Sequence, residues 1–329
     1  MENYKTKLGL IETEEAIKYI KDTFEDELAR ALALTRVSAP LFVLRTSGLN
    51  DDLNGVERSV SFDILQTGEE AEVVHSLAKW KRHALGKYGF APGSGIYTDM
   101  NAIRRDEECD AVHSLYVDQW DWEKVITAED RTPAFLQSTV RTIYTVITDV
   151  AAGVRRRWPQ ITTRLPSEIT FISAQQLEDQ YPTLTPQQRE DAITKAHGAV
   201  FVSGIGGALK SGRPHDGRAP DYDDWDLNGD ILVYYPQLGR AMELSSMGIR
   251  VDAESLARQL EIAGAQQRMQ LPFHQELAAG QLPLTIGGGI GQSRLCMFML
   301  EKAHIGEVHS SIWPAEMIAE CEKHNVFLL

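Results

Sequence analysis

Residues 285–295 read TIGGGIGQSRL, a glycine-rich run that leads directly into helix-forming residues. Glycines at a strand-to-helix turn let a nucleotide approach the backbone closely, so the run predicts a ligand-binding turn. No Gly-Lys-Ser or Gly-Lys-Thr follows, which excludes a Walker phosphate loop. A second glycine cluster, residues 203–209, has Leu209 where a dinucleotide fingerprint needs glycine or alanine. Taken alone, either cluster is explained as well by a tight turn.

The segments around the glycine-rich run predict a sheet flanked by helices. Apolar residues in 13–35 recur every three to four positions, which indicates an amphipathic helix capped by Thr13. Further helices are expected at 76–88, 135–158, 185–197 and after residue 291, and strands at 37–45, 57–65, 71–75, 112–123, 199–203, 230–235 and 241–251. Because the strands cluster without regular helical crossovers, we expect an α+β fold with a largely antiparallel sheet. Without repeats or an obvious linker, residues 1–329 are expected to form a single domain.

Composition restricts the partners and the compartment. The formal net charge is −14, from 33 Lys and Arg against 47 Asp and Glu, and such a field opposes a nucleic-acid partner. Cys109, Cys296 and Cys321 lack the spacing of a disulfide framework or a zinc site. No apolar run approaches the ~18–20 residues of a membrane-spanning helix. We therefore expect a cytoplasmic protein that binds neither nucleic acid nor membrane.

Polar and aromatic residues alternate along the second half of the strand predicted at 112–123. Alternation places Gln119 and Asp121 on one face and Trp120 and Trp122 on the other. If Gln119 and Asp121 are buried, they need polar partners, and a polar substrate can provide them. An amphipathic edge strand with one wet face explains the pattern equally well.

Two lysines lie in the helix predicted at 76–88, for which Ser76 is a suitable cap. Lys79 and Lys81 are two residues apart and point in different directions on a helix, so at most one of them is expected to face a site. Two solvated lysines are the simpler interpretation.

The acidic run 218–230, RAPDYDDWDLNGD, is followed by a strand and then by Glu243. Asp230 and Glu243 on neighbouring strands offer the hard oxygen ligands that Mg²⁺ prefers, although most acidic runs are solvated loops. Glu243 and Arg250 are seven residues apart, so strict alternation sends them to opposite faces. A bulge, which we place at Gly248, would bring them to the same face.

Taken in order, these pieces resemble the second and third signature motifs of class II aminoacyl-tRNA synthetases. Arg104 with Glu107 resembles the second motif, and the glycines with Arg294 resemble the third. Over residues 8–317 the sequence resembles even more closely the ammonia-dependent asparagine synthetases, which form the aspartate–ammonia ligase family. The phrases that carry this resemblance are EVVHSLAKWKR, LYVDQWDWE, RAPDYDDW, LNGDILV, ELSSMGIRVDA and TIGGGIGQSRL. One departure is the direct join of Trp225 to Asp226, where family members carry a longer segment.

The resemblance implies a class II synthetase-like core, usually a homodimer, with ATP as substrate and Mg²⁺ as its metal. The β-carboxylate of L-aspartate attacks the α-phosphate of ATP, and ammonia then converts β-aspartyl-AMP into asparagine and AMP. Arg104 is expected to clamp the α-phosphate, since charge builds there in the transition state. Arg294 is expected to cover the adenine and reach the γ-phosphate. The remaining ATP and metal contacts are expected from Glu107, Asp230 and Glu243.

The resemblance also implies how aspartate is oriented. In the aspartyl-tRNA synthetases, a lysine and an arginine matching Lys81 and Arg250 grip the side-chain carboxylate. Turning the substrate around lets the same pair hold its α-carboxylate and present the β-carboxylate to ATP. One carboxylate must accept a proton from ammonium, because only neutral ammonia is nucleophilic. Candidates for binding the α-ammonium or the incoming ammonium are Asp51, Asp121 and Asp223, with Ser76, Gln119 and Ser246 as hydrogen-bonding partners.

Two rival classes remain to be weighed against a ligase. A tRNA synthetase needs an anticodon-binding domain, and no segment is left over for one. An inactive paralogue that binds nucleotide or amino acid would be expected to lack Arg104 or Arg294, and both are present. Glutamine-hydrolysing asparagine synthetases expose an N-terminal cysteine, whereas this sequence begins Met1-Glu2, so free ammonia is the expected nitrogen donor.

Overall fold

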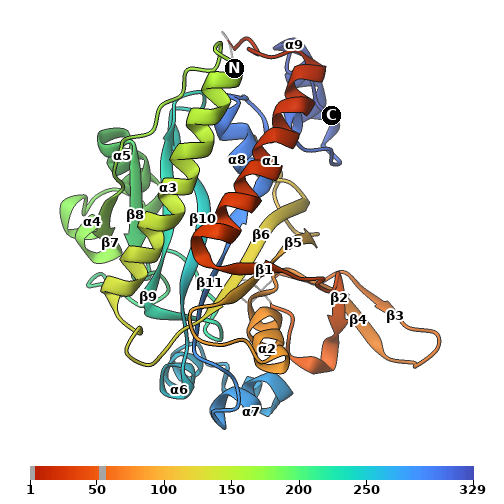
Figure 1. The fold of residues 1–329 in the computed structure, drawn as a ribbon, viewed down its shortest axis with the longest axis vertical. Helices are drawn as coiled ribbons and strands as arrows, with labels where there is room; N and C mark the ends of the chain where they lie inside the picture. The colour runs from red at the N-terminus through yellow and green to blue at the C-terminus, as the bar shows by residue number, and fades with distance from the viewer. Residues whose placement is uncertain (1–3, 52–56) are drawn as a thin grey trace.

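The structure is a computed structural model that describes residues 4–51 and 57–329. Its centre is an eight-stranded sheet (Figure 1), and the edge strands β1 and β7 pair parallel with their neighbours while the strands between them pair antiparallel. In spatial order the strands are β1 (Leu34–Arg36), β5 (Gly95–Ile103), β6 (Tyr116–Val125), β11 (Thr285–Gly291), β10 (Arg240–Arg250), β9 (Asp223–Tyr235), β8 (Ala199–Ser203) and β7 (Thr170–Ser173). The predicted α+β fold with a largely antiparallel sheet is confirmed.

Two long helices, α1 (Leu10–Leu32) and α3 (Pro133–Arg157), lie side by side across one face of this sheet (Figure 1). Trp120 and Trp122 of β6 are fully buried in the same cluster as the apolar residues of both helices, and the Phe24 ring of α1 lies 4.7 Å from that of Trp120. The apolar core therefore occupies this side of the sheet and leaves the other side for polar residues.

Shorter helices complete the fold. They are α2 (Ala78–Tyr88), α4 (Ala174–Gln180), α5 (Pro186–His197), α6 (Ala253–Ile262), α7 (Pro272–Ala278), α8 (Gln292–Met299) and α9 (Ala315–Lys323), with 3-10 turns η1 (Arg45–Ser47), η2 (Gln266–Gln270) and η3 (Ile305–Glu307). A second, three-stranded antiparallel sheet of β2 (Phe42–Leu44), β4 (Glu70–Val73) and β3 (Ser61–Asp63) extends from the body (Figure 1). None of the helices in the described part of the chain has the length and apolar character needed to span a bilayer.

The cap predicted for the first helix is wrong. The helix begins at Leu10, and its N-cap is Gly9, whose N–H donates to the Glu12 carboxylate at 3.0 Å. Thr13 is buried inside the first turn, where its hydroxyl accepts a bond from Lys302. Threonine is a residue type that often caps helices, but here Thr13 lies within the helix and contacts Lys302 in the C-terminal part of the chain.

The pairing of β10 with β9 is irregular at two places, and one of them is next to the predicted position at Gly248. The other shift, which the sequence did not predict, lies at Leu244, because Glu243 pairs with Leu232 and Ser245 with Ile231. Gly248 pairs with Asn228, but the next pair joins Arg250 to Asp223, so the register shifts directly after Gly248. Residues 224–227 of β9, which include the direct Trp225–Asp226 join, therefore leave the ladder. Trp225 packs against Gly206, where an added Cβ would lie 2.5 Å from the indole ring.

Candidate active site

A polar cavity of about 440 Å³ lies over the middle strands, lined by residues of β6, β10 and β11 and by residues 216–219, 222 and 223. The structure brings nearly all the predicted site residues to its wall: Ser76, Lys81, Arg104, Glu107, Gln119, Asp121, Asp223, Asp230, Glu243, Ser246, Arg250 and Arg294. Glu243 and Arg250 both line the cavity, and the register of β10 is irregular at two places between them, as the expected bulge requires. Asp51 is the predicted residue that does not line the cavity.

The alternation predicted for 112–123 is confirmed in β6. Gln119 and Asp121 face the cavity, whereas Trp120 and Trp122 pack in the apolar core. The edge-strand alternative is wrong, because β6 lies between β5 and β11. Its polar face is therefore buried by tertiary structure instead of being solvated.

Of the two lysines in α2, only Lys81 lines the cavity. Its ammonium lies 3.3 Å from Asp121 Oδ2 and donates to the Gly288 carbonyl at 3.1 Å. Burial lowers the pKa of Lys81, and the Asp121 and Glu123 carboxylates oppose that shift. Lys79 turns away and pairs with Asp221 at 3.1 Å. At most one of the two was expected to face a site, and this is confirmed, although both are buried instead of solvated.

Ser76 is not the cap of α2, since Leu77 occupies the N-cap position without a side-chain bond. Its hydroxyl instead donates to Asp51 Oδ2 at 2.7 Å. Asp51 is itself buried, and its charge acts with burial to raise the pKa of the Tyr222 phenol well above its usual range. Tyr222 lines the cavity, so Asp51 lies directly behind the wall formed by Ser76 and Tyr222. The rest of the loop, residues 52–56, lies outside the described part of the chain.

Arg250 is held on two sides by buried carboxylates. Its Nε and Nη2 donate to Glu123 at 2.9 and 2.7 Å, and its Nη1 donates to Asp223. Burial alone would lower the pKa of Arg250, but Glu123 and Asp223 raise it above its ordinary value. Glu123 also accepts a bond from Thr285 Oγ1 at 2.7 Å. Sequence reasoning missed Glu123, although continuing the alternation of Gln119 and Asp121 by two residues would have found it.

The glycines of residues 287–289 form part of the extended strand β11 instead of the predicted turn. A Cβ on Gly287 would lie 2.0 Å from Glu123 Oε2. One on Gly289 would lie 2.5 Å from Gln119 Oε1 and 2.8 Å from Asp121 Oδ1. The missing side chains of Gly287 and Gly289 therefore make room for polar groups of β6. Gly288, Gly289 and Gly291 line the cavity, and β11 passes directly into α8 after Gly291. The approach of a nucleotide to these glycines stays a prediction.

Two further arginines line the cavity, Arg104 after β5 and Arg294 on α8. Arg104 Nη1 lies 3.8 Å from Glu107, and Arg294 Nη1 lies 3.8 Å from Glu243. Among the residues that the structure describes, the buried Nε of Arg104 has no hydrogen-bond partner. An unpartnered guanidinium donor on a cavity wall that also carries Arg294 suits a phosphate.

The carboxylates of Asp230 on β9 and Glu243 on β10 also line the cavity; Glu243 lies 3.8 Å from Arg294, and Asp230 pairs with Arg218 at 2.6 Å. Burial raises the pKa of Asp230 to about 7; Arg218 opposes this shift, and Glu243 and Glu190 reinforce it. Such mutually repelling oxygen ligands fit Mg²⁺. Across residues 4–51 and 57–329, no group of three His, Cys, Asp or Glu side chains is arranged to hold a metal. The pair therefore suits a metal that ATP phosphates and water also coordinate.

The fold belongs to the same class as that of the asparaginyl- and aspartyl-tRNA synthetases. Asparaginyl-tRNA synthetase from Pyrococcus horikoshii, solved with asparaginyl-adenylate, is similar with a TM-score of 0.67 and 15% identity, over 92% of this chain and 70% of that one. Aspartyl-tRNA synthetase from Entamoeba histolytica is similar with a TM-score of 0.60 and 15% identity, over 90% of this chain and 58% of that one. At this identity, the likeness concerns the fold.

Sequence comparison is more specific. The family model for aspartate-ammonia ligase matches residues 11–325. An aspartate–ammonia ligase from Clostridium perfringens strain SM101 is 60% identical over 328 residues, 99% of this chain and 98% of the relative. One from Bacillus cereus strain G9842 is 58% identical over 325 residues, 99% of both chains. The chain belongs to the aspartate–ammonia ligase family.

Proposed function

We propose that this protein synthesises L-asparagine from L-aspartate, ammonia and ATP through β-aspartyl-AMP, releasing AMP and pyrophosphate. Family membership supplies the overall ligation and its need for ATP. One observation supports the adenylate route: the same cavity is lined by Arg104 and Arg294 and by the alternating buried charges around Lys81 and Arg250. We call the part with Arg104 and Arg294 the phosphate end and the part with Lys81 and Arg250 the amino-acid end.

The alternating charges suit aspartate as a zwitterion. Lys81 lies beside Asp121, and Arg250 lies beside Asp223. In the proposed pose the two cations hold the α-carboxylate, and the two aspartates face the α-ammonium, with Gln119, Ser76 and Ser246 as further hydrogen-bonding partners. Charges fixed in opposite pairs before the substrate arrives favour one orientation over its reverse. That orientation points the β-carboxylate toward the phosphate end.

In the first step, a β-carboxylate oxygen attacks the α-phosphorus, and the bond from that phosphorus to the bridging oxygen of pyrophosphate breaks. Arg104 binds the α-phosphate through its Nε, the donor for which the described residues provide no partner. Arg294 covers the adenine and reaches the γ-phosphate, and Glu107 is a further ATP contact. Phosphoryl chemistry of this kind depends on positioning and charge stabilisation. When bound at Asp230 and Glu243, Mg²⁺ neutralises charge on the departing pyrophosphate.

In the second step, ammonium loses a proton to a carboxylate, and neutral ammonia attacks the acyl carbon while AMP leaves. The hydrogen bond from Ser76 to Asp51 supports Asp51 as that base, because it links a hydroxyl on the cavity wall to a buried carboxylate. Asp121 and Asp223 are the alternatives if Asp51 instead serves the α-ammonium.

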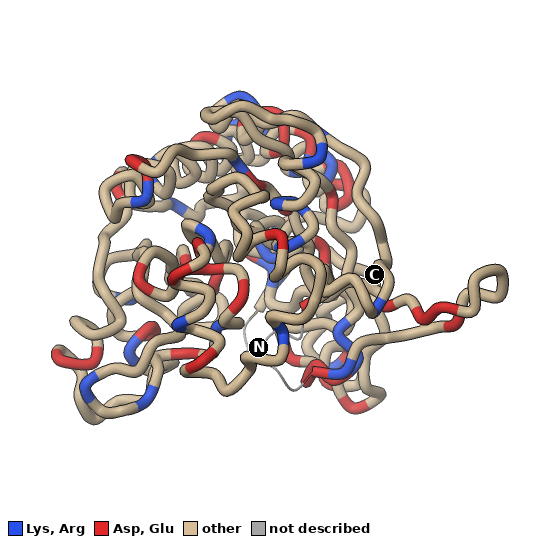
Figure 2. The backbone as a smooth tube through the Cα atoms, turned by 90° about the horizontal axis from the view of Figure 1, so that it is seen from below, with Lys and Arg blue, Asp and Glu red and all other residues tan. Residues whose placement is uncertain are grey.

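We further propose that residues 1–329 act as one catalytic domain, in a homodimer of the class II type, in the cytoplasm and without a nucleic-acid partner. The net charge of −14 supports the last point. Figure 2 shows Lys and Arg distributed among Asp and Glu along the chain, whereas a nucleic-acid site needs clustered positive charge.

The test is product identification. Purified protein with aspartate, ATP, Mg²⁺ and ammonium should yield asparagine, AMP and pyrophosphate in equal amounts, without tRNA. Formation of ADP and phosphate would overturn the proposal, since it requires an acyl phosphate instead of an adenylate.

A further inference from the structure

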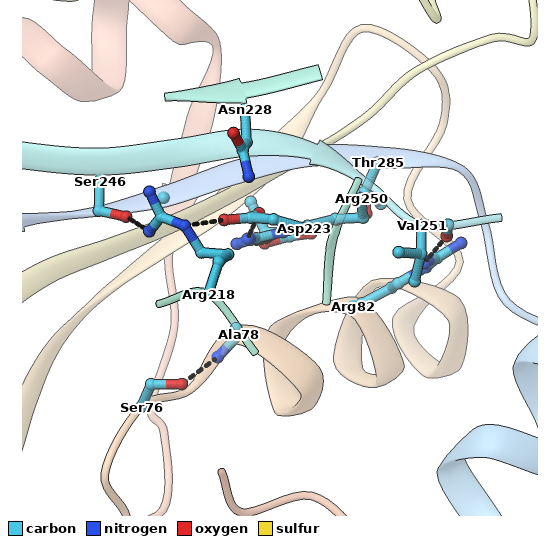
Figure 3. Close-up of polar contacts among 12 residues, drawn as sticks. Ser76, Ala78, Arg82, Arg218, Asp223, Asn228, Ser246, Arg250, Val251 and Thr285 are labelled. Carbon is cyan, nitrogen blue, oxygen red and sulfur yellow. Dashed lines mark hydrogen bonds and ion pairs between the residues drawn. The ribbon is translucent and has the colours of Figure 1, made fainter. Parts of the chain in front are cut away.

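Arg218 is a buried cation of the cavity that the sequence analysis did not single out. It lies in the segment between β8 and β9, and its side chain is 9% exposed. Its Nη1 donates to Ser246 Oγ, and its Nη2 donates to Asp230 Oδ1 at 2.6 Å. Figure 3 shows its guanidinium between Ser246 and Asp223. It therefore reaches three side chains on two different strands.

The contacts of Arg218 with β9 and β10 show where it lies along the cavity. Asp230 is paired with Ser246 in the register, and Asp223 is paired with Arg250 further along the same two strands. The first pair belongs to the end of the cavity with Glu243, and the second to the end with Arg250. Arg218 lies across the boundary between them, so it is placed where the amino-acid end meets the phosphate end.

Within residues 4–51 and 57–329, one donor of Arg218 has no hydrogen-bond partner. This is its buried Nε, which lies 3.9 Å from Asp223 Oδ2, too far for a hydrogen bond. A buried donor that stays unsatisfied is costly, and the guanidinium presents its donors in a planar fork that matches carboxylate and phosphate oxygens. The unsatisfied donor therefore indicates a group that arrives with the substrates.

We propose that Arg218 is a substrate-binding residue that contacts the acyl–phosphate junction, the oxygens of the aspartyl carboxylate and of the α-phosphate as they become joined. This inference rests on the proposed adenylate route. Attack of the carboxylate on the α-phosphorus brings two anionic groups together before pyrophosphate leaves with the electrons of the broken bond. Arg218 reduces their repulsion at the point of contact. Without substrates, the same guanidinium neutralises Asp230.

Calorimetry on the full-length protein can separate this role from a structural one. The ligands are Mg·ATP, L-aspartate, and a non-hydrolysable sulfamoyl analogue of β-aspartyl-AMP, which alone contains the joined groups. With Arg218→Gln, the Kd of the analogue should rise about 100-fold, while those of ATP and aspartate change less than about fivefold. Arg218→Lys keeps a charge beside Asp230 but loses the fork, so its Kd for the analogue should rise about tenfold.

Arg213→Gln is the matched control, because this exposed arginine lies in the same segment outside the cavity. A purely structural role predicts that Arg218→Gln weakens all three ligands equally and that Arg218→Lys restores them, which would overturn the inference. If Arg218→Gln does not fold, the test rests on Arg218→Lys alone. In that case, an Arg218→Lys variant that binds the analogue with wild-type affinity contradicts the inference. Failure of the unmodified protein to bind the analogue would count against the proposed function instead.

Discussion

At the residue scale, Asp51 is set apart by its position behind the cavity wall. Ser76 donates to it at 2.7 Å, and the Nδ1 of His75 lies 2.9 Å from its carbonyl oxygen. The phosphate end, with Arg104 and Arg294, is built from other elements. Adenylate formation needs phosphate ligands and metal, which Asp51 does not provide, whereas amide formation needs a base near the acyl carbon. The two half-reactions should therefore respond differently to its removal.

We expect Asp51→Ala to retain aspartate-dependent pyrophosphate release while asparagine synthesis falls by roughly 10²–10⁴-fold, the usual size of a general-base contribution. The measurement is single-turnover formation of β-aspartyl-AMP compared with its capture by ammonia. Asp63→Ala, on the exposed strand β3, is the control. An equal fall in both half-reactions would show that Asp51 binds the α-ammonium, and the base should then be sought at Asp121 or Asp223.

At the element scale, the glycines of β11 determine how the site packs. Polar side chains of the neighbouring strand β6 occupy the space where side chains of Gly287 and Gly289 would lie, so they pack directly against the backbone of β11. Alternation along β6 was sufficient to predict which residues face the cavity. That the glycines leave space for the side chains of β6 was not predictable, because this role depends on contacts between strands that are far apart in the sequence.

We expect Gly289→Ala to raise the KM for aspartate by about 10²-fold, since its Cβ would displace Gln119 and Asp121 and misplacement by about 1 Å carries that cost. The KM for ATP should change little. Gly207→Ala is the control, because nothing lies within 4 Å of its added Cβ. Unchanged aspartate kinetics in Gly289→Ala would show that Gln119 and Asp121 do not contact the substrate.

A second element-scale feature ties α1 and α8 to the sheet. Asp118 of β6 accepts bonds from Lys21 of α1 at 2.9 Å and from the backbone N–H of Ser293 in α8 at 3.0 Å. Burial alone would raise the pKa of Asp118, but Lys21 and His309 hold it below its ordinary value. A lowered pKa means that the charged form stabilises the fold above the unfolded pKa of about 3.9. This contribution is lost as pH falls through the folded pKa.

We therefore expect Asp118→Asn to lower the free energy of unfolding at pH 7 by about 1–3 kcal/mol, the range for hydrogen bonds to charged groups. The difference from the unmodified protein should shrink as the pH falls below about 3.9. Urea unfolding at a series of pH values measures both. Asp149→Asn, at an exposed position of α3, is the control. A difference that stays constant down to low pH would contradict the assignment of the effect to the Asp118 charge.

At the scale of the whole molecule, the sheet separates two environments. One face carries Trp120, Trp122 and the helices α1 and α3, and the other carries the polar cavity. Periodicity predicted which face of β6 is polar, and the resemblance to known synthetases pointed to many residues that line the cavity. Arg218 was missed because it lies in an irregular segment, where no period indicates the direction of a side chain. The register shift at Leu244 was missed because the register depends on pairing with β9, whereas the shift next to Gly248 was expected.

The central claim is that one cavity joins the β-carboxylate of aspartate to the α-phosphate of ATP. Transfer of an oxygen label tests it most directly. Unlabelled ATP and aspartate carrying ¹⁸O in its β-carboxylate are turned over with ammonium, and the nucleotide and phosphate products are examined by mass spectrometry. The adenylate route predicts that each AMP formed carries one oxygen from the labelled carboxylate, with none in pyrophosphate. Label found in inorganic phosphate beside ADP, or AMP without label, would contradict the account.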